Sequence, residues 1–266
     1  MHPVDFDKDM SQPPNSGHED ELKSQGYELV AGIDEVGRGA LAGPVVASAV
    51  ILPHPASLPW FELVRDSKEL NSRKRESLFD LISREAVAVG IGIVPPRMID
   101  SINILKATRL AMMQAVEKLP SQPGFLLIDR ITLPQCPIPQ MGITRGDRLC
   151  LSIACASIIA KVTRDRIMEE FDELYPGYGF AQHKGYGTGR HILCLQRLGP
   201  SPIHRLYFAP IRSIITGQRS SPCVPVQSEL FVSYHAEGVP MESGRPGNVV
   251  QGKLPERTND GPSTSR

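Results

Sequence analysis

Four carboxylates in this 266-residue sequence stand where an element of secondary structure is expected to end or to begin. Asp34 and Glu35 close one apolar stretch, Asp129 closes another, and Asp147 lies just before a long helical pattern. Mg²⁺ and Mn²⁺ prefer oxygen ligands and leave coordination positions open for water and phosphate. The pattern therefore indicates a candidate divalent-metal site made of these four side chains.

Ordinary structural roles fit the same residues. Asp147 has the position of a helix N-cap, and Asp129 that of a turn residue at the end of a strand. Asp34 and Glu35 fit a polar turn beside glycines, although two carboxylates in an apolar strand are costly to bury without a cation. Spacing alone leaves both interpretations open.

Hydrophobic patterning indicates the elements that must position these carboxylates. Short apolar runs predict strands at residues 29–34, 44–52, 86–94 and 125–129, and helical spacing predicts helices at 73–85, 98–118, 148–174 and 190–198. In the longest helix, Ser152, Ala156 and Ala160 lie four residues apart and form a stripe suited to close packing on a sheet. This mixture predicts an α/β domain with a partly antiparallel sheet.

Composition divides the chain into three parts. Residues 1–28 are predicted to be a flexible acidic tail, residues 29–216 the folded domain, and residues 217–266 a flexible tail rich in Pro, Gly and Ser. Of the 29 basic and 29 acidic side chains, 22 and 17 lie in residues 31–216, a net charge of +5. A basic core is compatible with nucleic-acid binding, but the excess is small.

The sequence argues against export and membrane insertion. No apolar run approaches the roughly 20 residues of a membrane helix. The acidic start lacks the basic flank and apolar stretch of a signal peptide. We therefore expect a cytoplasmic protein without membrane contact, and nothing suggests more than a monomer.

Eight sequence runs follow one another in order over residues 29–213, and the first of them contains Asp34 and Glu35. The first run is Gly32–Gly39 followed by Leu41–Val45. By this run the chain resembles type 2 ribonucleases H of the bacterial ribonuclease HII family. The others are Asp66–Leu70, Asn103–Thr108, Leu127–Asp129, Gly146–Asp147, Ala156–Asp165, His183–Thr188 and His204–Pro210.

The resemblance implies a ribonuclease H-like fold: a mixed central β-sheet flanked by helices, with a C-terminal helical part. It implies that Asp34, Glu35, Asp129 and Asp147 are both catalytic residues and metal ligands. Asp165 lies 18 residues after Asp147, about 27 Å along a continuous helix. Asp165 is therefore interpreted as structural, near Lys161.

The implied activity is that of a metal-dependent endonuclease (EC 3.1.26.4). It cleaves the RNA strand of RNA/DNA hybrids and nicks duplex DNA 5′ to single ribonucleotides, which serves ribonucleotide removal and RNA primer removal. Two Mn²⁺ or Mg²⁺ ions would leave a 5′-phosphate and a 3′-hydroxyl. The partners are hybrid and ribonucleotide-containing duplexes.

Substrate reading requires contact with a 2′-hydroxyl, which is both donor and acceptor. By resemblance, Gly37, Arg38, Gly39 and Tyr186 make it, although Tyr186 alone would fit a core aromatic. Side chains expected to contact phosphates are Ser67, Lys68, Arg145, Lys184 and Arg205, for each of which a solvated surface role is the alternative.

Two positions depart from the family pattern. Arg130 follows Asp129 where the family usually has Gly, and Arg145 replaces the usual Lys before Gly146. Rival hypotheses are a ribonuclease HIII, a junction resolvase on the same fold, and a nucleic-acid-binding protein without activity. The first would need an N-terminal domain longer than residues 1–28, and the last does not explain four retained carboxylates.

Overall fold

The computed structural model describes residues 13–53, 59–65, 67 and 70–217. The predicted C-terminal tail therefore lies outside the described residues, except for Gly217, which ends the last helix. None of the helices in the described part of the chain is both long and apolar enough to span a bilayer.

Five strands form one mixed sheet in the order β3-β2-β1-β4-β5. β1 (Val30–Val36) pairs antiparallel with β2 (Val45–Ile51), which pairs antiparallel with β3 (Ala88–Val94). β4 (Phe125–Asp129) runs parallel to β1, and β5 (Gln140–Ile143) runs parallel to β4. The predicted mixed sheet is confirmed, and β5 is a strand that sequence patterning missed.

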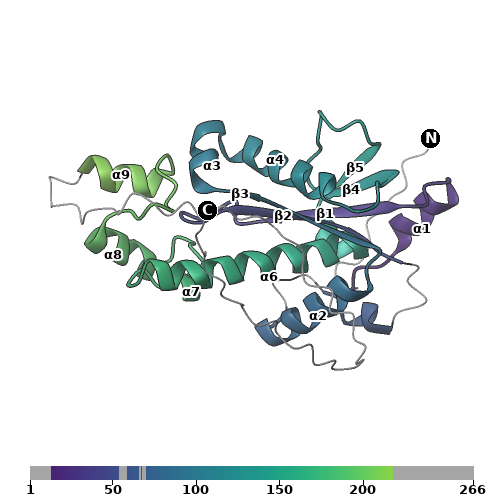
Figure 1. The fold of residues 1–266 in the computed structure, drawn as a ribbon, viewed down its shortest axis with the longest axis horizontal. Helices are drawn as coiled ribbons and strands as arrows, with labels where there is room; N and C mark the ends of the chain where they lie inside the picture. The colour runs from purple at the N-terminus through teal and green to yellow at the C-terminus, as the bar shows by residue number, and fades with distance from the viewer. Residues whose placement is uncertain (1–12, 54–58, 66, 68–69, 218–266) are drawn as a thin grey trace, which may run out of the picture. The chain divides into compact units, whose positions relative to one another are not determined.

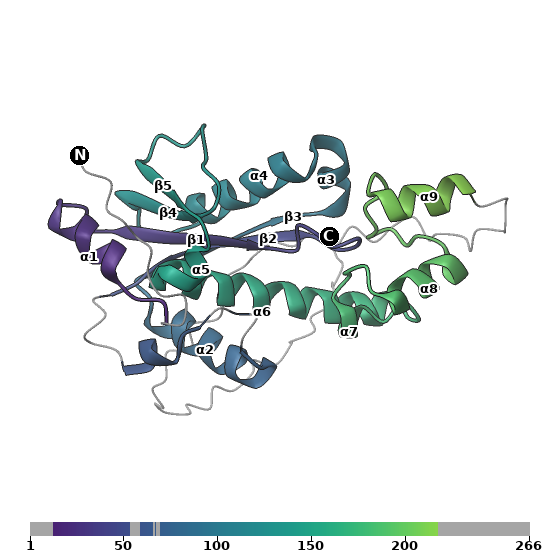
Figure 2. The same cartoon turned by 180° about the vertical axis from the view of Figure 1, so that it is seen from behind.

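Helices cover both faces of the sheet (Figures 1 and 2). α3 (Pro96–Ile102) and α4 (Ile104–Glu117) lie on one face, while α2 (Ser72–Glu85) and α6 (Leu151–Leu174) lie on the other. A separate apolar core fills each interface. Each fully buried Ile or Leu there contributes about 1.5–3 kcal/mol to folding.

The smaller elements close the ends of these layers. A 3₁₀ helix, η2 (Pro59–Leu63), precedes α2, and α5 (Gly146–Leu149) precedes α6. Beyond α6, a third apolar cluster joins α7 (Phe180–His183), α8 (Gly189–Leu198) and α9 (Ala209–Gly217). These three helices are the predicted C-terminal helical part, of which patterning had indicated only α8.

α6 lies unusually close to β1 and β2, as its small-residue stripe predicts. A Cβ placed on Gly32 would lie 2.2 Å from the carbonyl carbon of Ser152, so only glycine fits there. The Ser48 hydroxyl of β2 donates to the carbonyl of Ala156 at 3.0 Å. The backbone of the helix that follows Asp147 is thereby fixed against the strand that carries Asp34.

Two helices predicted as continuous are each broken. Residues 98–118 divide at Asn103, where φ is 71° and the side chain caps α4 by accepting from the N–H groups of Leu105 and Lys106. Residues 148–174 divide at Cys150, whose backbone is extended between α5 and α6. Apolar periodicity continued through both breaks, so patterning did not detect them.

Part of the predicted N-terminal tail is a helix, α1 (Gly17–Ser24). Its Glu19 is buried and accepts the N–H of Ser152 at 2.8 Å, in the first turn of α6. The backbone of Asn15 pairs with Leu149 and Leu151 on either side of the break. The expectation of a flexible tail is therefore wrong for residues 13–28, because a carboxylate at a helix N-terminus complements the helix dipole.

Candidate active site

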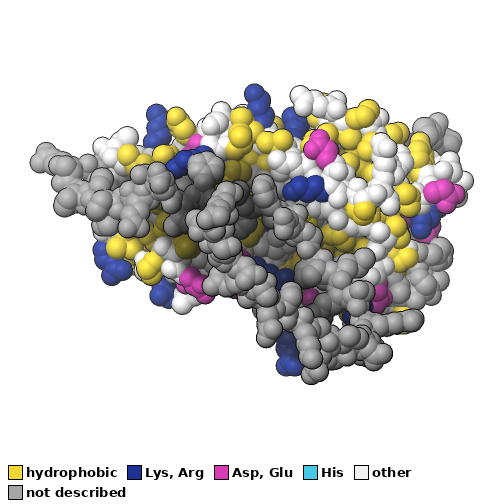
Figure 3. All heavy atoms as spheres, viewed as in Figure 1, with side chains coloured by type: hydrophobic (Ala, Val, Ile, Leu, Met, Phe, Trp, Pro, Cys, Tyr) yellow, Lys and Arg dark blue, Asp and Glu magenta, His cyan; other side chains and the backbone are white. Residues whose placement is uncertain are grey.

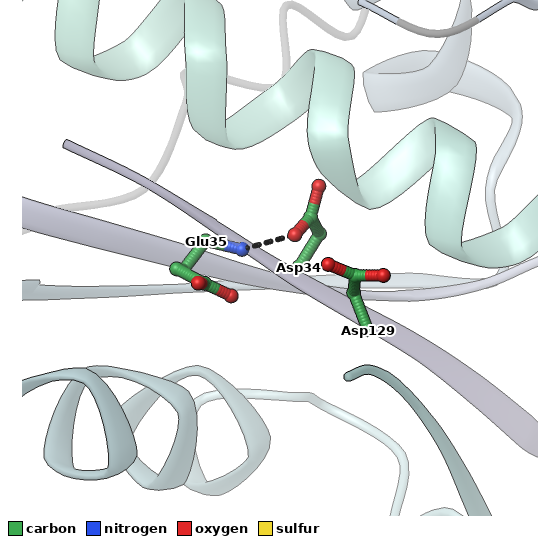
Figure 4. A group of neighbouring side chains, drawn as sticks. All are labelled: Asp34, Glu35 and Asp129. Atoms are coloured by element: carbon green, nitrogen blue, oxygen red, sulfur yellow. Dashed lines mark hydrogen bonds between the residues drawn. The ribbon is translucent and has the colours of Figure 1, made fainter. Parts of the chain in front are cut away.

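Three of the four predicted carboxylates come together at one edge of the sheet. Asp34 and Glu35 lie near the end of β1, and Asp129 ends the neighbouring parallel strand β4. One carboxylate oxygen from each lies within 4.8 Å of the others. Figure 4 shows Asp34 and Asp129 side by side, with Glu35 on the other side of β1. Parallel pairing places both strand ends together.

The carboxylates repel one another in a buried setting. Burial raises the pKa of Asp34 well above its usual value, and the charges of Glu35, Asp129 and Asp147 raise it further. Burial also raises the pKa of Glu35, although Arg38, whose Nη1 lies 2.9 Å from Glu35 Oε1, opposes the shift. Without a cation the ionised site is therefore unfavourable for the folded chain.

Asp147 lies next to this group without joining it. Its side chain is buried and its charge raises the pKa of Asp34, but its oxygens are not part of the three-residue cluster among the described residues. The preceding N–H, of Gly146, donates to Asp129 Oδ1 at 2.8 Å. The N-cap of α5 is Arg145, so the N-cap interpretation of Asp147 is wrong.

The donor set fits a hard divalent cation. All three clustered residues offer carboxylate oxygens, the ligands that Mg²⁺ and Mn²⁺ prefer. Oε2 of Glu35 is buried and has no hydrogen-bond partner among the described residues. A buried unpaired carboxylate oxygen is costly, and a cation would supply the missing partner.

The glycine turn, defined here as Gly37–Pro44, follows the carboxylates directly. Gly37 has φ of 90°, and a Cβ there would lie 2.2 Å from Arg164 Nε, so a side chain is excluded. Arg38 is half-buried and carries the ion pair to Glu35. The predicted substrate-reading turn thus lies beside the carboxylates and shares one ion pair with them.

The tyrosine loop, defined here as His183–Thr188, lies against the glycine turn. The N–H groups of Leu41 and Ala42 both donate to the carbonyl of Gly185, at 2.8 and 3.2 Å. Tyr186 is half-buried, with the Arg164 guanidinium 5.4 Å from its ring centroid. The structure therefore brings the two predicted sugar-reading segments together, though they are far apart in the sequence.

Within the described residues, the predicted phosphate contacts divide into three groups. Arg205 is fully buried and donates to backbone carbonyls of the glycine turn. The prediction that it contacts a phosphate, and the alternative of a solvated surface role, are therefore both wrong. Ser67 is buried with its hydroxyl 2.8 Å from that of Ser157, and Lys184 pairs with Glu169 at 2.6 Å. Arg145 is exposed. Lys68 lies outside the described residues.

Two exposed arginines flank Asp129 and Asp147 in the left-handed region. Arg130 has φ of 60° and Arg145 has φ of 59°. Glycine adopts this conformation at lower cost than arginine, which explains why glycine suits the position after Asp129. On the face in Figure 3, the described Lys and Arg side chains are scattered among apolar ones rather than gathered in one patch.

Sequence reasoning missed two contributors and correctly predicted one further contact. Arg164 is buried and donates to carbonyls of both loops, those of Pro44, Ala42 and Lys184, and its only sequence signal was its place in the run Ala156–Asp165. His191, in α8, was not singled out. Asp165 pairs with Lys161 at 2.6 Å, as predicted, and His183 and His204 are buried structural groups.

Comparison with known proteins places this arrangement in a family. The family model of ribonuclease HII matches residues 31–211. A ribonuclease HII of Dehalococcoides mccartyi is 55% identical over 204 residues, covering 77% of this chain and 96% of that protein. The ribonuclease HII of Geobacter sulfurreducens is 53% identical over 201 residues, covering 76% and 91%.

Solved structures agree with the fold. The ribonuclease H2 of Pyrococcus horikoshii OT3 aligns with a TM-score of 0.60 at 26% identity, covering 70% of this chain and 96% of that one. A Bst-RNase HIII in complex with Mn²⁺ aligns with a TM-score of 0.57 at 19% identity, covering 71% and 69%, and supports the fold alone. The ribonuclease H-like fold is thus confirmed. The chain belongs to the ribonuclease HII family, and is a metal-dependent endonuclease of the class that acts on RNA/DNA hybrids.

Proposed function

We propose that this chain, besides cleaving the RNA strand of hybrids, nicks duplex DNA on the 5′ side of a single embedded ribonucleotide. The observation that supports this is the adjacency of three parts: the carboxylate cluster, the glycine turn bonded to it through Arg38, and the tyrosine loop bonded to that turn through Gly185. Chemistry at a phosphate and recognition of the neighbouring sugar need this proximity.

Asp34, Glu35, Asp129 and Asp147 would hold two divalent cations, Mn²⁺ or Mg²⁺. Such ions lower the pKa of water and stabilise the leaving oxygen of a phosphodiester. Clustered oxygen donors and the unpaired Glu35 Oε2 support the proposal. The ribonuclease HIII of the same fold was solved with Mn²⁺.

The protein side chains orient the reaction. The Gly146 N–H holds Asp129, and the Glu35 N–H holds Asp34 at 2.7 Å, so both carboxylates keep a fixed direction. Arg38 reduces the negative charge that a phosphate meets. Backbone groups of Gly37, Arg38 and Gly39, with Tyr186, would contact the 2′-hydroxyl, which distinguishes RNA from DNA.

Contacts to phosphates would position the duplex without reading its sequence. Arg145 keeps this proposed role, and so do Ser67, Lys68 and Lys184. In this structure Ser67 and Lys184 are engaged by Ser157 and Glu169, so each would have to exchange a protein partner for a phosphate. We also propose that the protein is cytoplasmic and acts as a monomer. Sedimentation of the purified chain would test the monomeric state.

Three duplexes test the proposed activity: DNA with one ribonucleotide, an RNA/DNA hybrid, and DNA alone, each with Mg²⁺, Mn²⁺ or chelator. We expect metal-dependent nicking 5′ to the single ribonucleotide, leaving a 5′-phosphate and a 3′-hydroxyl, and no cleavage of all-DNA duplex. Cleavage of the hybrid alone would contradict the single-ribonucleotide activity and favour the specificity of the sister type.

Tyr186→Ala tests the sugar-reading role. The variant should lose most cleavage at the single ribonucleotide, because the ring contact and its fixed position are removed. The control is Tyr175→Ala, an aromatic residue after α6 whose ring centroid lies 6.2 Å from that of Phe171. Unchanged junction preference in Tyr186→Ala would argue against the role.

A further inference from the structure

Buried polar groups join the glycine turn and the tyrosine loop from behind. Arg205 donates to Gly37 O at 2.7 Å, to Arg38 O at 2.9 Å and to Gly43 O at 2.8 Å. Its side chain is fully buried among carbonyls. A buried guanidinium is tolerated only where its N–H donors are hydrogen-bonded. The Arg205 side chain therefore holds these carbonyl groups in place.

The residue before Arg205 reaches the other loop. The N–H of Ser201 donates to His204 Nδ1 at 2.8 Å, and a neutral imidazole has one donor and one acceptor nitrogen, so the proton of His204 is on Nε2. That N–H donates to His191 Nε2 at 3.0 Å. The proton of His191 is therefore on Nδ1, which donates to the carbonyl of Tyr186 at 2.9 Å.

The surrounding cluster keeps these histidines neutral. His204 and His191 are buried among Phe180, Tyr178 and His183, and the rings of His183 and His191 stack at 4.2 Å. Burial, with the His191 and His183 charges, lowers the pKa of His204 to about 3, and burial lowers that of His191. The hydrogen bonds thus have one consistent direction, from Ser201 to Tyr186.

We propose that His191, His204 and Arg205 are positioning residues that fix Tyr186 relative to the Gly37–Gly39 turn before substrate binds. His204 and Arg205 are neighbours in the chain, yet one is connected to the tyrosine loop through His191 and the other to the glycine turn. A single dipeptide therefore adds a further connection between two loops that also bond directly and through Arg164, and that must contact one sugar. This inference rests on the proposed role of the two loops.

Preorganisation gives the expected consequence. Loops held in the bound geometry pay their ordering cost during folding rather than during binding. The carboxylates themselves make none of these hydrogen bonds, and their backbone is held by the strand pairing of β1 and β4. Loosening the loops should therefore weaken substrate binding and leave the chemical step intact, so KM should rise while kcat stays constant.

The first test is independent of enzyme activity. Long-range ¹H–¹⁵N spectra of the full-length wild-type protein should show neutral His191 with its proton on Nδ1, and neutral His204 with its proton on Nε2. In His191→Phe, amide exchange should accelerate at Gly185–Thr188. It should not in Tyr178→Phe, which removes a partly buried hydrogen bond to Gly199 from the same cluster. An Nε2–H tautomer of His191 would overturn the proposal.

The second test separates positioning from general stability. His191→Phe and Arg205→Lys should each raise KM for the single-ribonucleotide duplex roughly fivefold to tenfold, with kcat within about twofold of wild type. His204→Gln retains a donor toward His191, so its KM should stay within about twofold of the wild-type value. Tyr178→Phe should leave KM unchanged, although it removes a hydrogen bond nearby.

The double variant His191→Phe with Arg205→Lys decides whether the loops form one unit. Coupled positions give non-additive effects, so its KM should exceed the larger single effect by no more than about twofold. Multiplication of the two effects, or unchanged KM in folded single variants, would overturn the proposal. If wild-type protein cleaves neither ribonucleotide substrate, the proposed function fails, while the tautomers and amide exchange still decide the positioning.

Discussion

The carboxylate cluster and the buried arginines behind the two loops differ in how their charges are neutralised. Asp34, Glu35 and Asp129 gather like charges and leave Glu35 Oε2 without a partner among the described residues. Arg164 and Arg205 are buried too, but carbonyl groups satisfy their guanidinium donors. The carboxylates need a cation to balance their charge, whereas the arginines have their hydrogen-bond donors satisfied within the protein. What sets the carboxylate cluster apart is that three carboxylates gather around one point while one of their buried oxygens is left without a partner among the described residues.

The largest expected effect is on activity at the carboxylates. Asp129→Asn keeps the shape and an oxygen that accepts the Gly146 N–H, but removes one ligand charge. We expect kcat to fall by on the order of a thousandfold, a loss of about 4 kcal/mol of transition-state stabilisation. Single-turnover cleavage with Mg²⁺ measures this. Near wild-type activity in a folded Asp129→Asn variant would remove Asp129 from the site.

Stability should change in opposite directions in the two regions. Arg205→Ala leaves several buried carbonyls unpaired and should destabilise the protein by about 3–5 kcal/mol. Asp34→Asn should stabilise the metal-free protein by about 1–3 kcal/mol, since like charges about 5 Å apart repel by about 3 kcal/mol at an effective dielectric constant near 20.

Urea unfolding in the presence of chelator measures both changes. Added Mg²⁺ should then stabilise wild type and not Asp34→Asn, because ligand binding to the folded state alone raises stability. A destabilised Asp34→Asn variant without metal would break the comparison, since it would show that the carboxylates are satisfied within the protein.

The next largest expected effect is on the pH dependence of stability, which should have opposite signs in the two regions. The pKa of His204 is lowered to about 3 in the folded chain, so between pH 6.5 and 3 the unfolded state binds the proton more readily. Stability from this group is present above pH 6.5 and is lost as the pH falls, by about 2 kcal/mol at pH 5. The raised pKa of Asp34 acts in the opposite direction, because its stabilising contribution is present at low pH and is lost as the pH rises.

Unfolding curves at pH 7, 6 and 5 for wild type and His204→Gln isolate the histidine, since both proteins share the carboxylates. The stability of wild type should fall more steeply with acid than that of the variant. Parallel pH profiles would show that His204 does not titrate below its ordinary pKa.

The smallest expected effect is at the contact between α1 and α6. Glu19→Gln keeps an acceptor for the Ser152 N–H but removes a charge at the start of α6. The loss should be about 1 kcal/mol, the usual size of a charge interaction with a helix terminus. Thermal unfolding measures it, with Glu21→Gln on the same helix as the control. Equal Tm values for the two variants would show that the buried carboxylate contributes no specific stabilisation.

Much of the site could be predicted because its residues end regular elements. Apolar runs predict β1 and β4, and the carboxylates at their ends follow from position in the sequence. The resemblance then adds the role of Tyr186. The sequence did not reveal that Asp147 lies beside the cluster rather than in it, because this depends on the break at Cys150.

The surface predictions succeeded less well, since a charge in a sequence carries no record of its neighbours. Arg205 was expected at a phosphate and is buried among carbonyls, and Lys184 is paired with Glu169. The N-terminal segment appeared too polar to pack, yet Glu19 is buried because the N-terminus of α6 provides donors for it.

The sequence by itself determined strands β1 to β4, helices α2 and α8 and the family, and it singled out the four carboxylates, because periodicity and motifs are local properties of the chain. Only the tertiary structure decided which loops touch, which arginines are buried, and in which direction the hydrogen bonds from Ser201 to Tyr186 run. The loop contacts and the burial of the arginines depend on groups more than a hundred residues apart, such as Arg205 and Gly37, whose contact arises only when the core has packed.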